Sequence, residues 1–407
     1  MSGRTVTGMV TKIDPRALVR ASGGPRYAVA LAVDALGTGL LRPFLLLYGV
    51  TVLALSPAAT GVAMTVGVVV GLVCMPGVGR WLDRGARSTV VAASMLVRLL
   101  GAVLLLVTPA GDVWVFGVAA LLLGVGNQAF PAAHAALVAT VAHGRERDAA
   151  LAGARSLRNA ALGVGALVAM AALAGGPGAM QVLAAGTGMA YLVAAVVAWS
   201  VHVHADPSAG AAEEGGDVTG MWGLLAANVV YVFCLNVPEI ALPLVLVTHL
   251  DASPVWSAVI FVANTVLVVT LQVPVTVAMS RLSRRTVLAL AGVVLAGSYL
   301  GFLAASALGP WAVAVVSVVC TLGEILYAGS ATALVTVLAP PRVLGRALAR
   351  FELSSGFGLA VSPAVITGLA AHGPTALWGG LAAATLLSAT AVTRDRSASA
   401  TPVSGTR

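Results

Sequence analysis

The sequence predicts an all-α membrane protein in which twelve transmembrane helices form two pseudo-symmetric six-helix bundles. Three observations support this fold class: the composition, a regular succession of long apolar runs, and an internal repeat. Of the 407 residues, 59% are hydrophobic and 9% are charged, whereas soluble domains carry roughly 25% charged residues. Because so apolar a chain cannot cover its own surface in water, a soluble globular protein is excluded.

Apolar runs separated by Gly, Pro and charged residues define the helices. Each run is long enough to cross a hydrocarbon core of about 30 Å at about 1.5 Å per residue. The predicted spans are 27–50, 56–78, 88–108, 113–139, 149–172, 179–203, 221–248, 254–279, 286–307, 311–339, 346–370 and 375–393.

The basic residues predict the orientation. If the N-terminus lies inside, the outer loops contain no Lys or Arg, and 17 of the 23 basic residues lie in inner segments. Since cytoplasmic loops are enriched in Lys and Arg, we expect a multi-pass protein of the plasma membrane, in a bacterial inner membrane, with both termini cytoplasmic. The sequence pI near 10 then reflects topology and not nucleic-acid binding.

The chain divides into five parts. The spans and the Gly-, Ala- and Ser-rich composition between them predict a cytoplasmic N-terminal tail (1–26), a first bundle (27–203), a cytoplasmic linker (204–220), a second bundle (221–393) and a disordered cytoplasmic tail (394–407).

The two bundles are related by an internal repeat with an offset of 197 residues. At this offset "AALVATVAHGR" (135–145) aligns with "TALVTVLAPPR" (332–342), and Ser56–Pro57 aligns with Ser253–Pro254. A parallel six-plus-six repeat is typical of transporters that bind substrate near the membrane midplane, between the halves.

The stretch "GRWLDRGARS" (79–88) concentrates charge in a turn between the second and third spans. Gly79, Asp83, Arg84 and Arg87 resemble the loop signature of the major facilitator superfamily, although Ala86 stands where a second Gly is usual. The resemblance implies the twelve-helix fold of that family and a latch at the inner face, in which Asp83 holds a neighbouring helix end or an Arg. The alternative is that the stretch only anchors the topology.

The first span, "DALGTGLLRPFLLLY" (34–48), resembles the pattern of twelve-helix drug exporters of that superfamily, with a Leu-Gly pair followed by Pro43. Other exporter signatures are altered, because Leu121 occupies the usual Arg position of the fourth span. The resemblance implies proton-driven export and a role in drug resistance.

Of the ionisable residues inside predicted spans, five are singled out here. An isolated charge near the bilayer centre costs at least about 2.5 kcal/mol, so such residues are functional candidates. Asp34 is suited to proton exchange or to binding a cationic substrate, because burial disfavours its charged form. Arg98, in the third span, is either its structural partner or a replacement for the missing Arg of the fourth span.

The other three are related by the repeat. Arg42 and Glu239 are 197 residues apart, so we expect them to meet across the pseudo-twofold axis as an outer gate that closes when the protein faces inward. Glu324 is equivalent to Asn127 and is a second candidate for carrying a proton or binding a cation. Because spans one, four, seven and ten line the cavity in this superfamily, Asn127, Gln128 and Asn236 are further candidates for that cavity.

These features predict a secondary transporter that works by alternating access, most simply a proton-coupled antiporter that exports small amphipathic or cationic compounds. The alternatives are a proton-coupled symporter or facilitator that imports a nutrient or metabolite, and a non-transporting receptor or membrane-embedded enzyme. No ATP-binding motif is present and Cys74, Cys234 and Cys320 lie in apolar spans. We therefore expect no cofactor, no metal site and no catalytic residues, and a monomer powered by the proton gradient.

Overall fold

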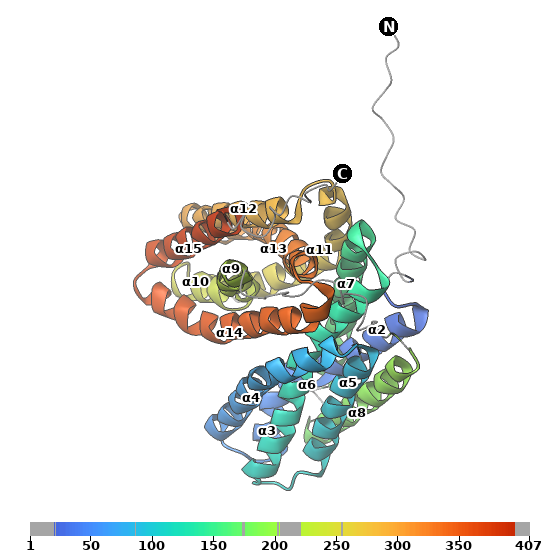
Figure 1. Ribbon diagram of the computed structural model, residues 1–407. Coiled ribbons are helices and arrows are strands. Elements are labelled where there is room, and N and C mark those ends of the chain that lie inside the picture. The colour runs from blue at the N-terminus through green and yellow to red at the C-terminus, as the bar shows by residue number, and fades with distance from the viewer. Residues whose placement is uncertain are drawn as a thin grey trace, which may run out of the picture.

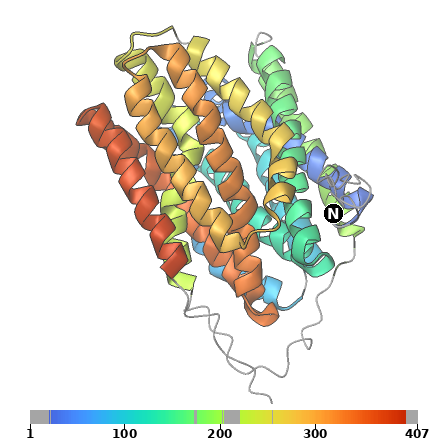
Figure 2. The same ribbon diagram turned by 90° about the horizontal axis from the view of Figure 1, so that it is seen from above.

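The computed structural model describes residues 20, 22–85, 87–172, 176–201, 203, 221–253 and 255–394. The predicted linker, most of the predicted N-terminal tail and the end of the C-terminal tail lie outside these residues. Within them the chain forms two groups of helices, α2 to α8 and α9 to α15 (Figure 1). In the view of Figure 2 the long helices run roughly along one common direction.

The first half contains six spans, of which the first is interrupted. Arg42 and Pro43 lie in a short 3-10 segment that divides this span, because Pro lacks the backbone N–H that continues an α-helix. The elements are α2 (Pro25–Leu41), η1 (Arg42–Phe44), α3 (Leu45–Thr51), α4 (Pro57–Asp83), α5 (Arg87–Val107), α6 (Val113–Val141), α7 (Gly144–Ala172) and α8 (Gly176–Trp199).

The second half repeats this order, and its first span is also interrupted. A 3-10 segment and a π-helical segment replace the middle of that helix, where Pro238 and Pro243 both lack an N–H donor. The elements are α9 (Trp222–Tyr231), η4 (Val232–Asn236), η5 (Val237–Ala241), α10 (Leu242–Thr248), α11 (Val255–Met279), α12 (Arg284–Ala305), α13 (Pro310–Leu338), η6 (Pro341–Val343), α14 (Leu344–Ala371) and α15 (Pro374–Arg394).

Helix bounds repeat with the offset that the sequence predicts. Both ends of α6 (Val113–Val141) lie 197 residues before the ends of α13 (Pro310–Leu338), and α5 begins 197 residues before α12. The interruptions at η1 and η5 fall at equivalent places. The offset of 197 therefore describes the structure as well as the sequence.

The predicted fold class is confirmed. Eleven of the described spans have the length and hydropathy of membrane-crossing helices. The twelfth, α7, is 29 residues long but is less apolar, because its middle carries Arg155 and Arg158. The twelve-helix prediction therefore holds for the described residues, with one span that is charged at its centre.

Two helix ends differ from the predicted ones by five residues, more than any other end of the described helices. α4 continues to Asp83 and does not stop at 78, and α7 begins at Gly144 and not at 149. Gly79 and Asp83 thus belong to the last turns of a helix and not to a loop. Asp83 and Asp148, the acidic residues of these two helix ends, are held in helical turns because each pairs with an Arg of the other half.

The halves meet mainly through two helix pairs, α4 with α14 and α7 with α11; both pairs lie side by side in Figure 1. We name the two ends of the bundle by their turns. The arginine-rich end has turns at 84–85, 142–143, 280–283 and 339–340, each with an Arg in it or within two residues of it (Arg84, Arg145, Arg281 and Arg342). The arginine-free end has turns without Arg or Lys at 52–56, 108–112, 249–253 and 306–309.

Candidate functional site

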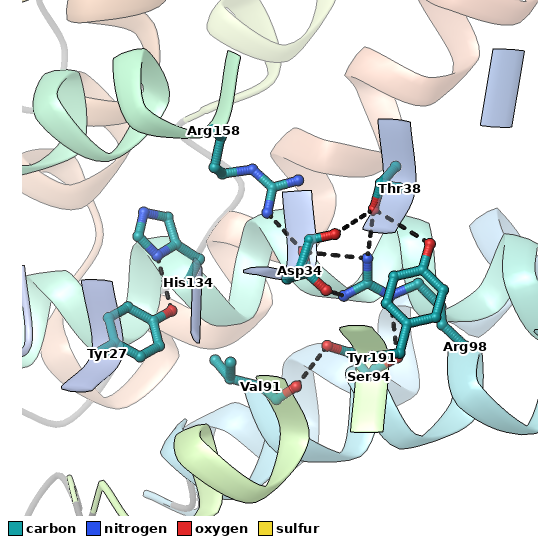
Figure 3. Close-up of polar contacts among 9 residues, drawn as sticks. All are labelled: Tyr27, Asp34, Thr38, Val91, Ser94, Arg98, His134, Arg158 and Tyr191. Atoms are coloured by element: carbon teal, nitrogen blue, oxygen red, sulfur yellow. Dashed lines mark hydrogen bonds and ion pairs between the residues drawn. The ribbon is translucent and has the colours of Figure 1, made fainter. Parts of the chain in front are cut away.

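Asp34 lies at the centre of a buried charge cluster in the first half (Figure 3). Its carboxylate, on α2, is fully buried and accepts two hydrogen bonds from Arg98 of α5, at 2.5 Å from Nη2 and 3.3 Å from Nη1. Arg158 of α7 donates from Nη1 at 3.0 Å. The predicted Asp34–Arg98 pair is therefore present. The guanidinium of Arg158 also binds Asp34, which the sequence analysis did not predict.

Aromatic rings and a close helix approach hold Arg98 in place. Its guanidinium lies 4.7 Å from the centre of the Tyr191 ring and 5.3 Å from that of Phe130, distances at which cation–π attraction contributes. A Cβ atom on Gly126 would lie 2.4 Å from Arg98 Cγ. The glycine of α6 thus provides the space in which a long cationic side chain can be buried.

Tyr27 and His134 extend this cluster towards the arginine-rich end. The Tyr27 hydroxyl and His134 Nδ1 are 2.9 Å apart, and the imidazole stacks between the rings of Tyr27 and Phe130. Phe130 also lies under Arg158, at 4.2 Å. A continuous row of aromatic and charged groups therefore connects α2, α6 and α7.

A second cluster joins the two halves at mid-membrane depth. Arg155 Nη2, on α7 of the first half, lies 3.5 Å from Glu324 Oε1, on α13 of the second half. The Glu324 side chain is 8% exposed, whereas 34% of the Arg155 side chain is exposed and its Nε has no hydrogen-bond partner. The contact is long and single, so it can break when the halves move.

Glu324 has polar neighbours within its own half. Asn264 of α11 hydrogen-bonds the carboxylate, and the Thr321 hydroxyl donates to the Asn264 amide oxygen at 2.6 Å. The sequence analysis missed Asn264, Thr321, Arg155 and Arg158. Arg155 and Arg158 are three residues apart on one helix face, a spacing that could have identified them.

Glu352 of α14 was also missed. It interacts electrostatically with Arg155 and lies 197 residues after it, so the two occupy equivalent places in α14 and α7. The repeat could have found this pair, because the same reasoning singled out Arg42 and Glu239.

Asp83 connects α4 to the start of α14 at the arginine-rich end. Its Oδ1 accepts hydrogen bonds from the backbone N–H groups of Gly345 at 2.7 Å and Arg346 at 3.3 Å, and its Oδ2 lies 2.6 Å from Arg346 Nε. A Cβ on Gly79 would lie 2.8 Å from Arg346 Cα. Gly79 therefore permits the close helix approach that lets Asp83 reach the N-terminus of α14, a favourable place for a carboxylate.

A second contact closes the same end on the other side of the interface. Asp148 of α7 pairs with Arg284 of α12 at 2.7 Å, and Arg147 donates to the Thr336 carbonyl of α13 at 3.2 Å. The predicted spans leave Arg147, Asp148 and Arg284 in inner loops. They act instead as contacts between the halves because α7 begins one turn earlier than predicted.

Arg42 and Glu239, the predicted outer gate pair, are not joined by an ion pair in this structure, and both side chains are exposed. The contacts described above hold the arginine-rich end together, so this conformation is closed at that end. A gate at the arginine-free end is expected to close when the arginine-rich end is open. The Arg42–Glu239 pair therefore stays a prediction for that other conformation.

Three of the remaining predicted residues, Gln128, Asn236 and Arg87, lie at helix contacts. Gln128 lies beside Gly71 of α4 and Gly356 of α14. Asn236 donates to the Ser362 hydroxyl of α14 at 2.5 Å, and Arg87 donates to the Ala136 carbonyl at 3.1 Å. Asn127 is partly buried and Arg84 is exposed.

Comparison with known proteins defines the class to which this architecture belongs. The Major Facilitator Superfamily matches the chain twice, over residues 27–237 and 224–407. The chain belongs to this family, whose members are transporters and not enzymes. No relative among curated protein sequences matches the chain.

Solved structures share the fold at low sequence identity. The proton:xylose symporter XylE is 12% identical with a TM-score of 0.73, over 93% of this chain and 95% of its own. A bacterial homologue of the iron transporter ferroportin, in an outward-facing state, is 13% identical with a TM-score of 0.71, over 91% and 98%. The human organic anion transporter MFSD10 (TETRAN) is 13% identical with a TM-score of 0.70, over 93% and 100%.

Proposed function

We propose that this transporter is a proton-coupled antiporter that exports small amphipathic or cationic compounds by alternating access. In this proposal the arginine-rich end faces the cytoplasm, both termini are cytoplasmic, and the protein acts as a monomer in a bacterial inner membrane. The observation that carries the proposal is the Arg155–Glu324 contact, because it connects the two halves through a carboxylate that can gain or lose a proton.

The proposed coupling follows from the charge on Glu324. The ionised carboxylate attracts Arg155 and holds the halves together at mid-depth, whereas a proton removes this attraction. A cationic substrate that binds the same carboxylate displaces the proton, so substrate and proton alternate. Asp34 is the second candidate for this role, but its two arginine partners and full burial favour Glu324.

Export and the chemistry of the cargo are supported by sequence features. The first span follows the exporter pattern, and the spans contain few groups that could hydrogen-bond a sugar. The structural relatives are described as carrying xylose, iron and organic anions. Since one fold serves such different cargoes, the substrate must be inferred from the site of this chain.

A second candidate is a proton-coupled symporter that imports an anionic nutrient or metabolite. It is favoured by the exposure of Arg155 and Arg158, 34% and 24% of the side chain, which offers guanidinium groups to an anion. An anion would compete with ionised Glu324 for Arg155, so its binding would be accompanied by proton uptake.

The sign of proton exchange distinguishes the two candidates. Purified full-length protein in weakly buffered detergent is exposed to panels of lipophilic cations and amphipathic carboxylates, and the pH is recorded. Antiport predicts proton release with a cation, lost in Glu324→Gln and kept in the control Glu146→Gln, an exposed residue of α7. Uptake with an anion would support symport. Exchange that survives in Glu324→Gln and disappears in Asp34→Asn would transfer the role to Asp34.

A further inference from the structure

A small cavity lies beside Glu324 and is lined by residues of the second half. Its volume is about 10 Å³, close to the roughly 10–15 Å³ that one water-sized sphere requires. Oxygen-bearing side chains of α11 and α13 line it, namely Asn264, Ser317, Thr321 and Glu324. These four side chains are the oxygen-bearing part of a lining that also includes Ile260 and Cys320.

The interrupted helix of the second half forms the opposite wall of this cavity. Three residues of this interrupted helix line the cavity, namely Val237 and Pro238 of η5 and Leu242, the first residue of α10. Pro243 supplies no N–H to the Glu239 carbonyl, which an α-helix would use. Backbone carbonyls at such breaks coordinate small cations in other transporter folds.

Comparison of the two halves shows that these oxygen atoms are specific to the second half. At the offset of 197 residues, Asn264, Ser317, Thr321 and Glu324 correspond to Gly67, Ala120, Gly124 and Asn127. The first-half helices are in direct backbone contact there, since a Cβ on Gly124 would lie 2.3 Å from the Gly67 carbonyl oxygen. The first half therefore has no room for a ligand at the place where the second half has a cavity with four oxygen-bearing side chains in its lining.

We propose that this cavity binds a monovalent cation, Na⁺, through Glu324, Thr321, Asn264 and Ser317. Oxygen ligands suit hard cations, and a single carboxylate balances one positive charge but not two. The sequence analysis expected no metal site because its three cysteines lie in apolar spans; neutral oxygen ligands around one carboxylate are a different chemistry. Arg155 shares this carboxylate, so Na⁺ on the cavity side weakens the contact between the halves.

The inference rests on the proposed role of Glu324 in coupling and adds a second ion to it. Na⁺ and a proton would compete for one carboxylate, and each would release Arg155. The charged groups that act on Glu324 are Arg155 in direct contact and Glu239 at longer range.

Thermal unfolding of purified full-length protein tests the site in the wild type. Unfolding temperatures are measured in NaCl, KCl and choline chloride at equal ionic strength. A ligand that binds only the folded state raises the unfolding temperature in a saturable way. We expect such a rise with Na⁺ and not with choline. Equal curves in the three salts would overturn the proposal without using any variant.

Variants then assign the response to the cavity. Thr321→Val and Asn264→Leu remove oxygen atoms at nearly constant volume, and we expect the dissociation constant for Na⁺ to rise about tenfold or more. Thr321→Ser keeps the hydroxyl and should keep the response. Thr385→Val is the matched control, because Thr385 of α15 is equally buried, at 2% exposure, and does not line the cavity. An unchanged Na⁺ response in both Thr321→Val and Asn264→Leu would also overturn the site.

Failure of this inference and failure of the proposed function give different results. If Na⁺ has no specific effect but substrate-linked proton exchange still depends on Glu324, only the cation site is wrong. If Na⁺ stabilises the protein through Thr321 while Glu324→Gln leaves proton exchange intact, the cation site stands and the proposed proton role is wrong.

Discussion

Arg98 and Arg158 share one carboxylate but differ in burial, and this difference predicts different energetic roles. The Arg98 side chain is 1% exposed and donates twice to Asp34, whereas the Arg158 side chain is 24% exposed and donates once. Removing one partner of a fully buried ion pair is costly because the remaining charge has no solvent. Arg98 is therefore expected to stabilise the fold, and Arg158 to be available for function.

We predict that Arg98→Met lowers the free energy of unfolding by about 3–5 kcal/mol. Arg158→Met should cost less, about 1.5–3 kcal/mol, the value of a hydrogen bond to a charged group. Denaturant titration of both variants in detergent micelles measures the difference. Equal losses of unfolding free energy in the two variants would show that the partial exposure of Arg158 does not reduce its contribution to stability.

Asp83 caps α14 across the interface, so its charge controls the closure of the arginine-rich end. We predict that Asp83→Asn opens this end about two- to tenfold more often, because an ion pair exposed in this way contributes about 0.2–1 kcal/mol and the charge at the helix N-terminus a similar amount.

Cysteine labelling measures this opening. Ala349 is 1% exposed and packs against Gly79, so Ala349→Cys in a chain without its native cysteines reports access to the interface. Asp112→Asn is the control, because Asp112 caps α6 within its own half. A labelling rate that is unchanged by Asp83→Asn, or equally raised by Asp112→Asn, would contradict the latch.

At the scale of elements, α4 and α14 approach closely enough to exclude a methyl group. Gly77 and Gly79 lie on the same helix in different surroundings: a Cβ on Gly77 meets no atom within 4 Å, whereas one on Gly79 meets the Arg346 backbone at 2.8 Å. The contact is formed by backbone, which cannot move aside as a flexible side chain can.

We predict opposite effects for two single-methyl substitutions in α4. Gly77→Ala should raise the free energy of unfolding by about 0.5–1 kcal/mol, because Ala favours the helix. Gly79→Ala should force α4 and α14 apart and raise the labelling rate at Ala349→Cys. If both variants behave alike, helix propensity and not interface packing governs this helix.

Interruptions at equivalent places in the first spans of the two halves have different consequences. In the first half η1 carries Arg42, and in the second half η5 carries Glu239 and borders the cavity near Glu324. Proline produced both interruptions, but the side chains around them have diverged. The pseudo-symmetry thus applies to the backbone, whereas the functional side chains at equivalent places differ between the two halves.

For the whole molecule, the contacts between the halves define one state of a two-state cycle. Asp83–Arg346 joins α4 to α14, and Asp148–Arg284 joins α7 to the first residue of α12, so the arginine-rich end is held on both sides of the interface. The acid comes from α4 in one contact and from α7 in the other. Both pairs are partly exposed, and such pairs contribute little net energy, as a contact that opens in every cycle requires.

The opposite state should bring Arg42 and Glu239 together. We predict that Arg42→Glu and Glu239→Arg each impair transport and that the double variant restores it, because the pair keeps its opposite charges. Uptake or extrusion by proteoliposomes measures the rescue once a substrate is known. Oxidative crosslinking of Arg42→Cys with Glu239→Cys, in a chain without its native cysteines, tests the approach earlier and should increase in the Gly79→Ala background. Crosslinking that does not respond to Gly79→Ala would argue against a gate coupled to the latch.

Much of the architecture follows from one-dimensional patterns. Long apolar runs require helices in a membrane because the backbone has no water with which to bond, so the twelve spans and the 197-residue repeat could be predicted. Arg98 could be proposed as the partner of Asp34 because a charge in hydrocarbon needs one. Arg155 and Arg158 were not recognised as site residues, since their positions in the inner turns of a predicted span made them look like topology signals. Glu352 was not considered.

The sequence by itself therefore determined the fold class, the number and order of spans, the pairing of the halves by repeat, and the need for Asp34 and Glu324 to have partners. Only the tertiary structure decided which partners they have, because the side chains that meet depend on which helix faces pack against each other. Packing placed two arginines on Asp34 and brought Arg155 to Glu324 across the halves. It also left a cavity with four oxygen-bearing side chains in the second half, where the first half has Gly67 packed against Gly124. The volume of a side chain decides whether a cavity forms only where helices pack against each other.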